Sequence, residues 1–116
     1  MRIFFLYSIA IIVSGGLASI SGYAPAASFN CNLAKGCVEN VICQSPQLSK
    51  LDSEMAEIYY EIKAEFSRNQ RDLLKEFVED QKAWLRDRNA CGCNANCLLR
   101  EYRRRIGDLY SWHEYI

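Results

Sequence analysis

The fold is decided by residues 81–97, which read QKAWLRDRNACGCNANC. Gln81, Trp84, Arg88 and Cys91 are three or four residues apart, so they share one face of a helix. This face is half polar, and the helical pattern stops at a cluster of cysteines before a second helical pattern begins. A helix that ends in such a cluster predicts a small bundle cross-linked by disulfide bonds.

The first 26 residues have the features of a secretory signal peptide. Arg2 supplies a positive charge, residues 3–20 are mostly apolar, and residues 24–26 read APA, the small-residue pattern of a cleavage site. We expect cleavage after Ala26, which leaves a domain of residues 27–116 without membrane attachment. A retained membrane anchor is the alternative, but the apolar run is short and polar residues interrupt it.

The remaining domain is small and nearly neutral. Removing Arg2 from the 14 basic residues leaves 13 against 14 acidic ones, a formal net charge of −1. This balance does not predict nucleic-acid binding. A chain of about 90 residues buries too little surface to be very stable without help. All six cysteines lie in this part, and an even number in a small exported chain predicts a disulfide framework.

Four amphipathic segments predict an all-α fold. The first is a short helix over residues 37–43, and the second begins at Pro46 after an N-cap at Ser45. The pattern breaks at residues 67–70, where Asn69 is expected to cap a third helix. Because this connection is short, the second and third helices should form an antiparallel hairpin.

The third predicted helix ends near Ala90. Asn94 or Asn96 is expected to cap the fourth helix, whose apolar stripe runs from Leu98 to Tyr110. The residues after Tyr110 are expected to fray.

Six cysteines allow many pairings, and the sequence alone does not select one. One bridge would close the loop between the third and fourth helices, and another would run back along the short first helix. The remaining bridge would tie the segment before the first helix to the hairpin. The pairs favoured on these grounds are Cys91–Cys97, Cys31–Cys43 and Cys37–Cys93, and other pairings stay open.

The cysteine cluster also suggests two chemical alternatives. Cys91 and Cys93 could be a redox pair, and with Cys97 and a fourth cysteine they could bind zinc. No neighbouring histidine supports a reactive thiolate, and an oxidising compartment favours disulfides. We therefore expect structural disulfides, no metal and no cofactor.

The sequence offers little to catalysis. His113 is the single histidine and lies near the end of the chain, where we expect an exposed side chain and not a general base. Serines occur in the signal peptide and at helix caps. No catalytic residue is predicted, and the protein is not expected to be an enzyme.

Two helices carry clusters of charge. Four glutamates of the second helix, here called the acidic ridge, lie opposite part of its apolar stripe: Glu54, Glu57, Glu61 and Glu65. The fourth helix is basic through Arg100, Arg103, Arg104 and Arg105. Each set is expected to be a solvated face, and the two could attract each other across the bundle. Read as a binding surface, the ridge would suit a basic partner.

Arg88 is expected to lie inside the bundle. The antiparallel hairpin brings it close to Asp52, near the start of the second helix, which favours a buried ion pair whose disruption would be costly. A ligand-binding role for Gln81, Trp84 and Arg88 is the alternative.

Short motifs are spread over the chain in a specific order: FNC at 29–31, ENVIC at 39–43, LSKLD at 48–52, QKAWLRDRNAC at 81–91, CL at 97–98 and YRRRI at 102–106. In this order they resemble the LprI-like lysozyme inhibitor domain of exported bacterial proteins. The resemblance covers about residues 29–109, nearly the whole domain after cleavage.

The resemblance implies a small helical exported domain. Its usual cysteines correspond to Cys31, Cys43, Cys91 and Cys97, so Cys37 and Cys93 depart from the pattern as an additional pair. The motif residues are interpreted as fold determinants: Asp52, Gln81, Trp84, Arg88 and Tyr102. The resemblance also implies inhibition of c-type lysozyme, without identifying an inhibitory residue.

Three functions follow as hypotheses. The first is a non-enzymatic binding protein, periplasmic or secreted, that inhibits c-type lysozyme through the acidic ridge while a side chain on a loop occludes the cleft. The second is an interaction module of the cell envelope without lysozyme activity. The third is a thiol–disulfide oxidoreductase. The sequence predicts a protein partner but no oligomeric state.

Overall fold

The computed structural model describes residues 27–116, and the predicted signal peptide lies outside the described residues. The described chain contains α-helices and one short 3-10 helix, with no strand in residues 27–116. The elements are η1 (Cys31–Leu33), α1 (Gly36–Gln44), α2 (Pro46–Asn69), α3 (Arg71–Ala90) and α4 (Ala95–His113). The prediction of an all-α fold is confirmed.

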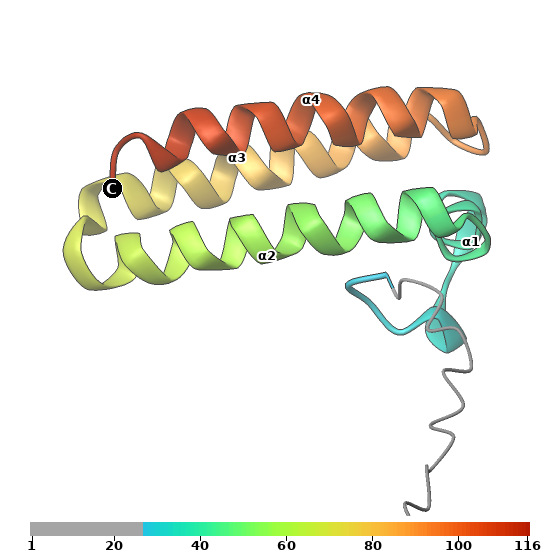
Figure 1. Ribbon diagram of the computed structural model, residues 1–116, viewed down its shortest axis with the longest axis horizontal. Coiled ribbons are helices and arrows are strands. Elements are labelled where there is room, and N and C mark those ends of the chain that lie inside the picture. Colours follow the sequence, from blue (N-terminus) through green and yellow to red (C-terminus); the bar gives the residue numbers. More distant parts are fainter. Residues whose placement is uncertain (1–26) are drawn as a thin grey trace, which may run out of the picture.

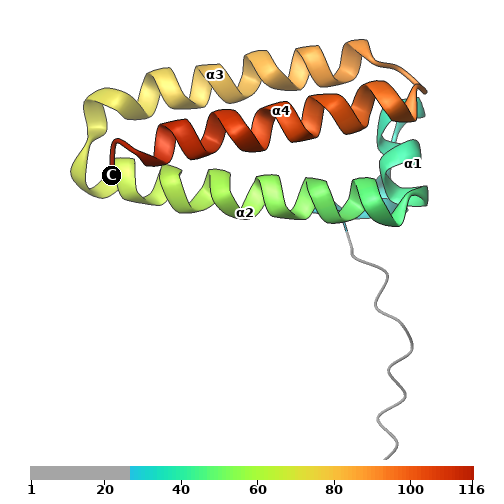
Figure 2. The same ribbon diagram turned by 45° about the horizontal axis from the view of Figure 1, so that its top comes forward.

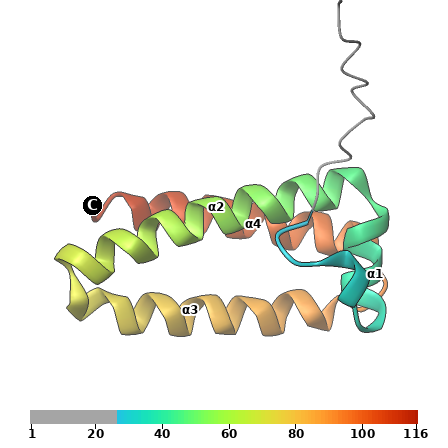
Figure 3. The ribbon, with the colours of Figure 1, turned by 90° about the horizontal axis from the view of Figure 1, so that it is seen from below.

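The three long helices run side by side, and α1 lies across one end of them (Figure 1). In Figure 2, α4 lies between α3 and α2, with α1 closing the end of the bundle. The segment before α1 crosses the face of α2 and α3 that is turned away from α4 (Figure 3). We call the end that carries α1 the disulfide end, and the opposite end the aromatic end.

Two helix starts follow the predicted capping. The Ser45 side chain accepts a hydrogen bond from the backbone N–H of Leu48 at 3.2 Å, and Pro46 is the first residue of α2. Of the two predicted caps for α4, Asn94 is the one used, because its Oδ1 accepts from the N–H of Cys97 at 3.0 Å.

The connection between α2 and α3 is shorter than predicted. The prediction that Asn69 caps α3 is wrong, because α2 continues through Asn69 and Gln70 alone joins the two helices. The physical reason is local: the side chains of Arg68 and Asn69 both donate to the carboxylate of Glu65, one turn earlier on α2. These contacts extend the helix past its expected end.

The end of α4 is also more ordered than predicted. The helix extends to His113, so fraying directly after Tyr110 is not observed. The indole of Trp112 packs edge-on against Phe66 and Phe77, with ring centroids 6.0 and 5.4 Å away. This aromatic packing stabilises the last turn of α4 in its helical conformation.

The core runs the length of the bundle between the long helices. Its fully buried members include Ile42 and Leu48 at the disulfide end and Phe66 and Phe77 at the aromatic end. Burying one such side chain contributes about 1.5–3 kcal/mol to folding. No helix in residues 27–116 has both the length and the apolar character needed to cross a membrane.

All six cysteines form disulfides at one end of the bundle. The bridges are Cys31–Cys43, Cys37–Cys93 and Cys91–Cys97, with Cα–Cα distances of 5.8, 5.2 and 5.5 Å. They are the three pairs that the sequence favours. Cys91 and Cys93 therefore have different partners and do not form a bridge with each other. Within the described part of the chain, no group of acidic, histidine or cysteine side chains is arranged to hold a metal ion.

Candidate functional site

Three motif residues from three helices meet in the interior near the disulfide end. Asp52 of α2 is 1% exposed, and its Oδ1 accepts a hydrogen bond from the Tyr102 hydroxyl of α4 at 2.7 Å. Arg88 of α3 donates from Nη1 to the same hydroxyl at 3.4 Å and lies 4.0 Å from Asp52 Oδ1. The structure thus brings the expected pair of Asp52 and Arg88 together, with Tyr102 bridging them.

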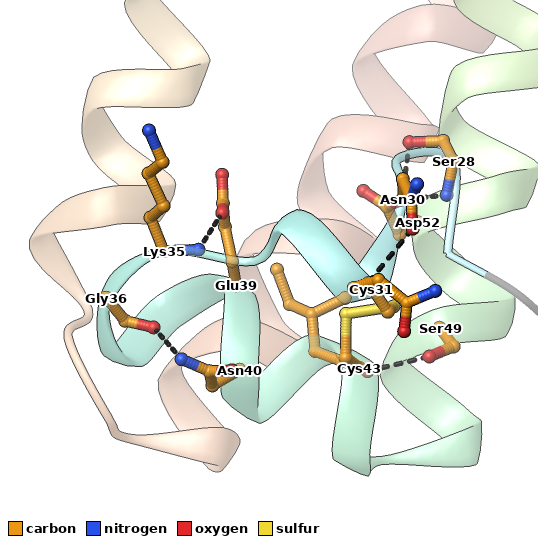
Figure 4. The surroundings of a disulfide bond; sticks show 12 residues. Ser28, Asn30, Cys31, Lys35, Gly36, Glu39, Asn40, Cys43, Ser49 and Asp52 are labelled. Carbon is orange, nitrogen blue, oxygen red and sulfur yellow. Dashed lines mark hydrogen bonds between the residues drawn. A yellow bond between two sulfur atoms is a disulfide. The ribbon is translucent and has the colours of Figure 1, made fainter.

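The N-terminal segment completes this site. The backbone N–H and the hydroxyl of Ser28 both donate to the second oxygen of Asp52, at 2.6 and 2.5 Å. Figure 4 shows Ser28 beside Asp52, close to the disulfide between Cys31 and Cys43. The sequence contains no signal for this contact, because an isolated serine in an extended segment does not point to a distant carboxylate.

The environment of Tyr102 perturbs its ionisation. Burial raises the pKa of its hydroxyl far above the usual value, and the negative charge of Asp52 raises the pKa further. The hydroxyl therefore stays protonated and remains a donor to Asp52.

A second buried cluster joins α3 and α4. Arg105 is 1% exposed; its Nε donates to Gln81 Oε1 at 2.9 Å and its Nη1 to Asp80 Oδ2 at 2.6 Å. The indole N–H of Trp112 donates to the same Asp80 oxygen at 3.0 Å. The remaining nitrogen of Arg105, Nη2, is buried and has no hydrogen-bond partner among the described residues.

The burial of Arg105 corrects the prediction that it belongs to a solvated face. Arg105 lies three residues after Tyr102 and four before Leu109, so it occupies the apolar stripe of α4. Its charge is tolerated there because Asp80 and Gln81 supply acceptors. The spacing could have revealed its position, but the run of arginines around it favoured the surface interpretation.

The other motif residues also contact the core. Gln81 donates from its amide to the Met55 sulfur at 3.3 Å, while Trp84 donates to the backbone carbonyl of Glu101 at 3.2 Å. The Trp84 ring packs edge-on against Tyr102, with centroids 5.2 Å apart. These contacts support a role for both residues in positioning the helices.

A groove lies between α2 and α3, on the face opposite α4. Its volume is about 350 Å³, and its lining includes Asp52 and Arg88 together with apolar side chains such as Met55. Tyr60, 62% exposed, lies at its rim. The groove therefore places the buried polar cluster close to an accessible surface.

The acidic ridge is only partly free in the structure. Glu57 and Glu61 are exposed, whereas Glu54 and Glu65 are half-buried. Hydrogen bonds from Asn69 and Arg68 lower the pKa of the Glu65 carboxyl. Glu61 Oε1 lies 3.8 Å from Nε2 of His113, which is exposed as predicted.

The basic residues of α4 do not pair with this ridge. Among residues 27–116, no ion pair joins the ridge to Arg100, Arg103, Arg104 or Arg105. Arg104 pairs instead with Glu101, Asp87 and Asp108, at 2.6, 3.3 and 3.2 Å. The expected attraction across the bundle is therefore not seen as direct contacts, and Glu57 remains available to a partner.

A comparison with known proteins assigns the chain to a family. A protein-family model described as "Lysozyme inhibitor LprI" matches residues 31–109, from the first cysteine to the last buried leucine of α4. No curated protein and no solved structure matches the chain. The matched range contains all six cysteines and the buried residues Asp52, Arg88 and Arg105. The chain belongs to the LprI lysozyme inhibitor family.

Proposed function

We propose that this protein is an exported, non-enzymatic binding protein that inhibits c-type lysozyme. The observation that carries this proposal is the family match over residues 31–109, which covers most of the described chain. The predicted signal peptide and the complete pairing of the cysteines fit an oxidising location, the periplasm or the extracellular space.

The construction of the bundle suits inhibition by binding. Three disulfides and two buried polar clusters hold the helices in one arrangement. A body that is already ordered loses little conformational entropy when it binds, so more of its contact energy appears as affinity. This property supports a recognition role.

The acidic ridge provides an electrostatic contribution. Lysozymes of the c type are generally basic, and exposed Glu57 and Glu61 present negative charge to such a surface. Attraction of this kind accelerates association and weakens as salt is added. We propose the ridge as a steering surface for the enzyme.

The test is a turbidity assay of cell-wall lysis with purified, oxidised protein spanning residues 27–116. We expect c-type lysozyme to be inhibited at protein concentrations on the order of 10 µM or below. Absence of inhibition at that concentration would refute the proposal for this chain. Recovery of a single different partner from a cell-envelope extract would then favour the interaction-module alternative.

The ridge is tested separately by charge removal. Glu57→Gln with Glu61→Gln should lower the association rate several-fold at low salt and much less at high salt. The matched control is Asp72→Asn with Glu76→Gln, which makes the same change of charge at exposed positions of α3. Equal effects of the two double variants would show that net charge matters and that the ridge has no special role.

A further inference from the structure

The segment of residues 30–36, which we call the stapled loop, exposes most of its side chains although it is covalently fixed. Leu33 is 70% exposed, more than any other large apolar side chain of the described chain. The 3-10 helix η1 that contains it has no buried residue. The stapled loop therefore adds little to the core.

Several bonds nevertheless hold this loop in one conformation. Disulfides flank it on both sides, through Cys31 to Cys43 and through Cys37 to Cys93. The Asn30 side chain accepts from the N–H of Asn32 at 2.9 Å, and the N–H of Lys35 donates to the Glu39 carboxylate at 2.6 Å (Figure 4). Gly36 supplies the positive φ of 74° with which the chain turns into α1.

This combination has a physical consequence. Cross-links around a segment whose side chains are mostly exposed fix the shape of an exposed surface. Such a surface binds without first losing the conformational freedom of a flexible loop, which increases affinity for a partner of matching shape. Rigid exposed loops with a central apolar side chain are suited to enter a concave site.

The side chains of the loop define the chemistry of that site. Lys35 is exposed, and its ammonium makes no ion pair with any described residue; in Figure 4 it extends away from α1. Leu33 lies two residues earlier and is also exposed. A free ammonium two residues from an exposed apolar side chain fits a cleft that carries carboxylates at its centre. Lysozyme has carboxylates in its cleft, because glycoside hydrolysis uses a pair of carboxyl groups.

We infer that the stapled loop enters the substrate cleft of lysozyme, where Leu33 contacts the sugar-binding surface and the Lys35 ammonium faces the catalytic carboxylates. This inference rests on the proposed function and specifies how it is carried out. It assigns the occluding contact to the loop and leaves to the acidic ridge only the steering of the encounter.

The test compares loop variants with matched exposed variants in a kinetic assay on a soluble oligomer of N-acetylglucosamine. Leu33→Ala should raise the inhibition constant about tenfold or more, and Lys35→Gln several-fold, because both remove contacts at the centre of the interface. The controls are Tyr110→Ala, at a side chain that is 56% exposed, and Lys50→Gln, at an exposed lysine of α2. These controls should change the constant by less than about twofold.

The mode of inhibition supplies a second readout. Occupation of the cleft predicts competitive inhibition, in which the apparent KM of lysozyme rises while kcat stays constant. Far-UV circular dichroism and the mass of the fully oxidised chain verify that each variant is folded, as their exposure predicts. If wild-type protein inhibits but the loop variants match their controls, or if inhibition is not competitive, the loop assignment is wrong while the proposed function stands. If wild-type protein does not inhibit, both are wrong.

Discussion

The two ends of the bundle are held together by different means. At the disulfide end, three bridges join α1, the loop before α4 and the segment around η1. At the aromatic end, the rings of Phe66, Phe77 and Trp112 pack edge-on, with centroid distances of 5.3 to 6.0 Å, and no cysteine is present. Covalent bonds add to side-chain packing at one end, and side-chain packing alone maintains the other.

The difference follows from the lengths of the elements. Helix α1 has 9 residues, and Ile42 is its one fully buried residue. Packing alone therefore gives this helix little stability. Helix α2 has 24 residues and α3 has 20, which is enough for each to bury a continuous stripe. Two of the three cross-links therefore involve the short helix α1, whereas the long helices are also held along their length by packing.

The largest loss of stability is expected when an aromatic ring is removed from the aromatic end. Phe77→Ala removes a fully buried ring that contacts Tyr59, Phe66 and Trp112, so it should lower the free energy of unfolding by about 3–5 kcal/mol. Urea denaturation with intact disulfides measures this loss. Tyr110→Ala, at an exposed ring, should change stability by no more than about 0.5 kcal/mol. A similar loss in both variants would contradict the importance of aromatic packing.

The next largest effect is expected from the longest cross-link. Cys37→Ser with Cys93→Ser removes a bridge between residues 56 positions apart, which should lower the free energy of unfolding by about 2–4 kcal/mol. Removing Cys91 and Cys97, which are 6 positions apart, should destabilise less, because a shorter loop restricts the unfolded chain less. Thermal unfolding of both variants compares the two bridges, and equal losses would rule out this chain-entropy explanation.

Much of the disulfide end could be predicted from the sequence, because its signals are local. Ser45 with Pro46, and Asn94, mark helix starts by short-range chemistry, and the cysteine spacing restricts the bridges that two adjacent helices can form. The proximity of Asp52 and Arg88 followed from the antiparallel hairpin alone.

The features that were missed depend on contacts between distant residues. The burial of Arg105 requires Asp80 and Gln81 of another helix, and the order of Trp112 requires rings on α2 and α3. The contact of Ser28 with Asp52 spans 24 residues and has no periodic pattern. Such contacts become visible only when the helices are placed against one another.

A smaller loss of stability is expected when a single hydrogen bond at the aromatic end is removed. Trp112→Phe keeps most of the ring packing but removes the indole N–H that donates to Asp80, so it should destabilise the fold by about 1–2 kcal/mol. Tyr115→Phe, at an exposed ring, is the control and should be nearly neutral. If the two substitutions had equal effects in chemical denaturation, the hydrogen bond would contribute nothing measurable.

The smallest expected effect is a loss of stability at alkaline pH that depends on the Tyr102 hydroxyl. The pKa of Tyr102 is raised in the folded state, mainly by burial and then by Asp52, so the unfolded chain loses the hydroxyl proton first as pH rises. The contribution of Tyr102 to stability is therefore complete below about pH 9 and declines above about pH 10, by roughly 1 kcal/mol near pH 11. Urea denaturation across this range should show a shallower decline for Tyr102→Phe than for wild type. Identical slopes would show that this hydroxyl does not titrate differently in the two states.

On this account, the Cys31–Cys43 disulfide fixes the stapled loop as an exposed recognition surface and is not required for packing of the bundle. The most direct test is calorimetric titration of c-type lysozyme with the Cys31→Ser, Cys43→Ser variant, whose remaining bridges are intact. We predict unchanged helix content and an affinity about tenfold or more below that of wild type, because the loop must now be ordered on binding. An affinity equal to wild type, or a loss of helix content, would contradict this account.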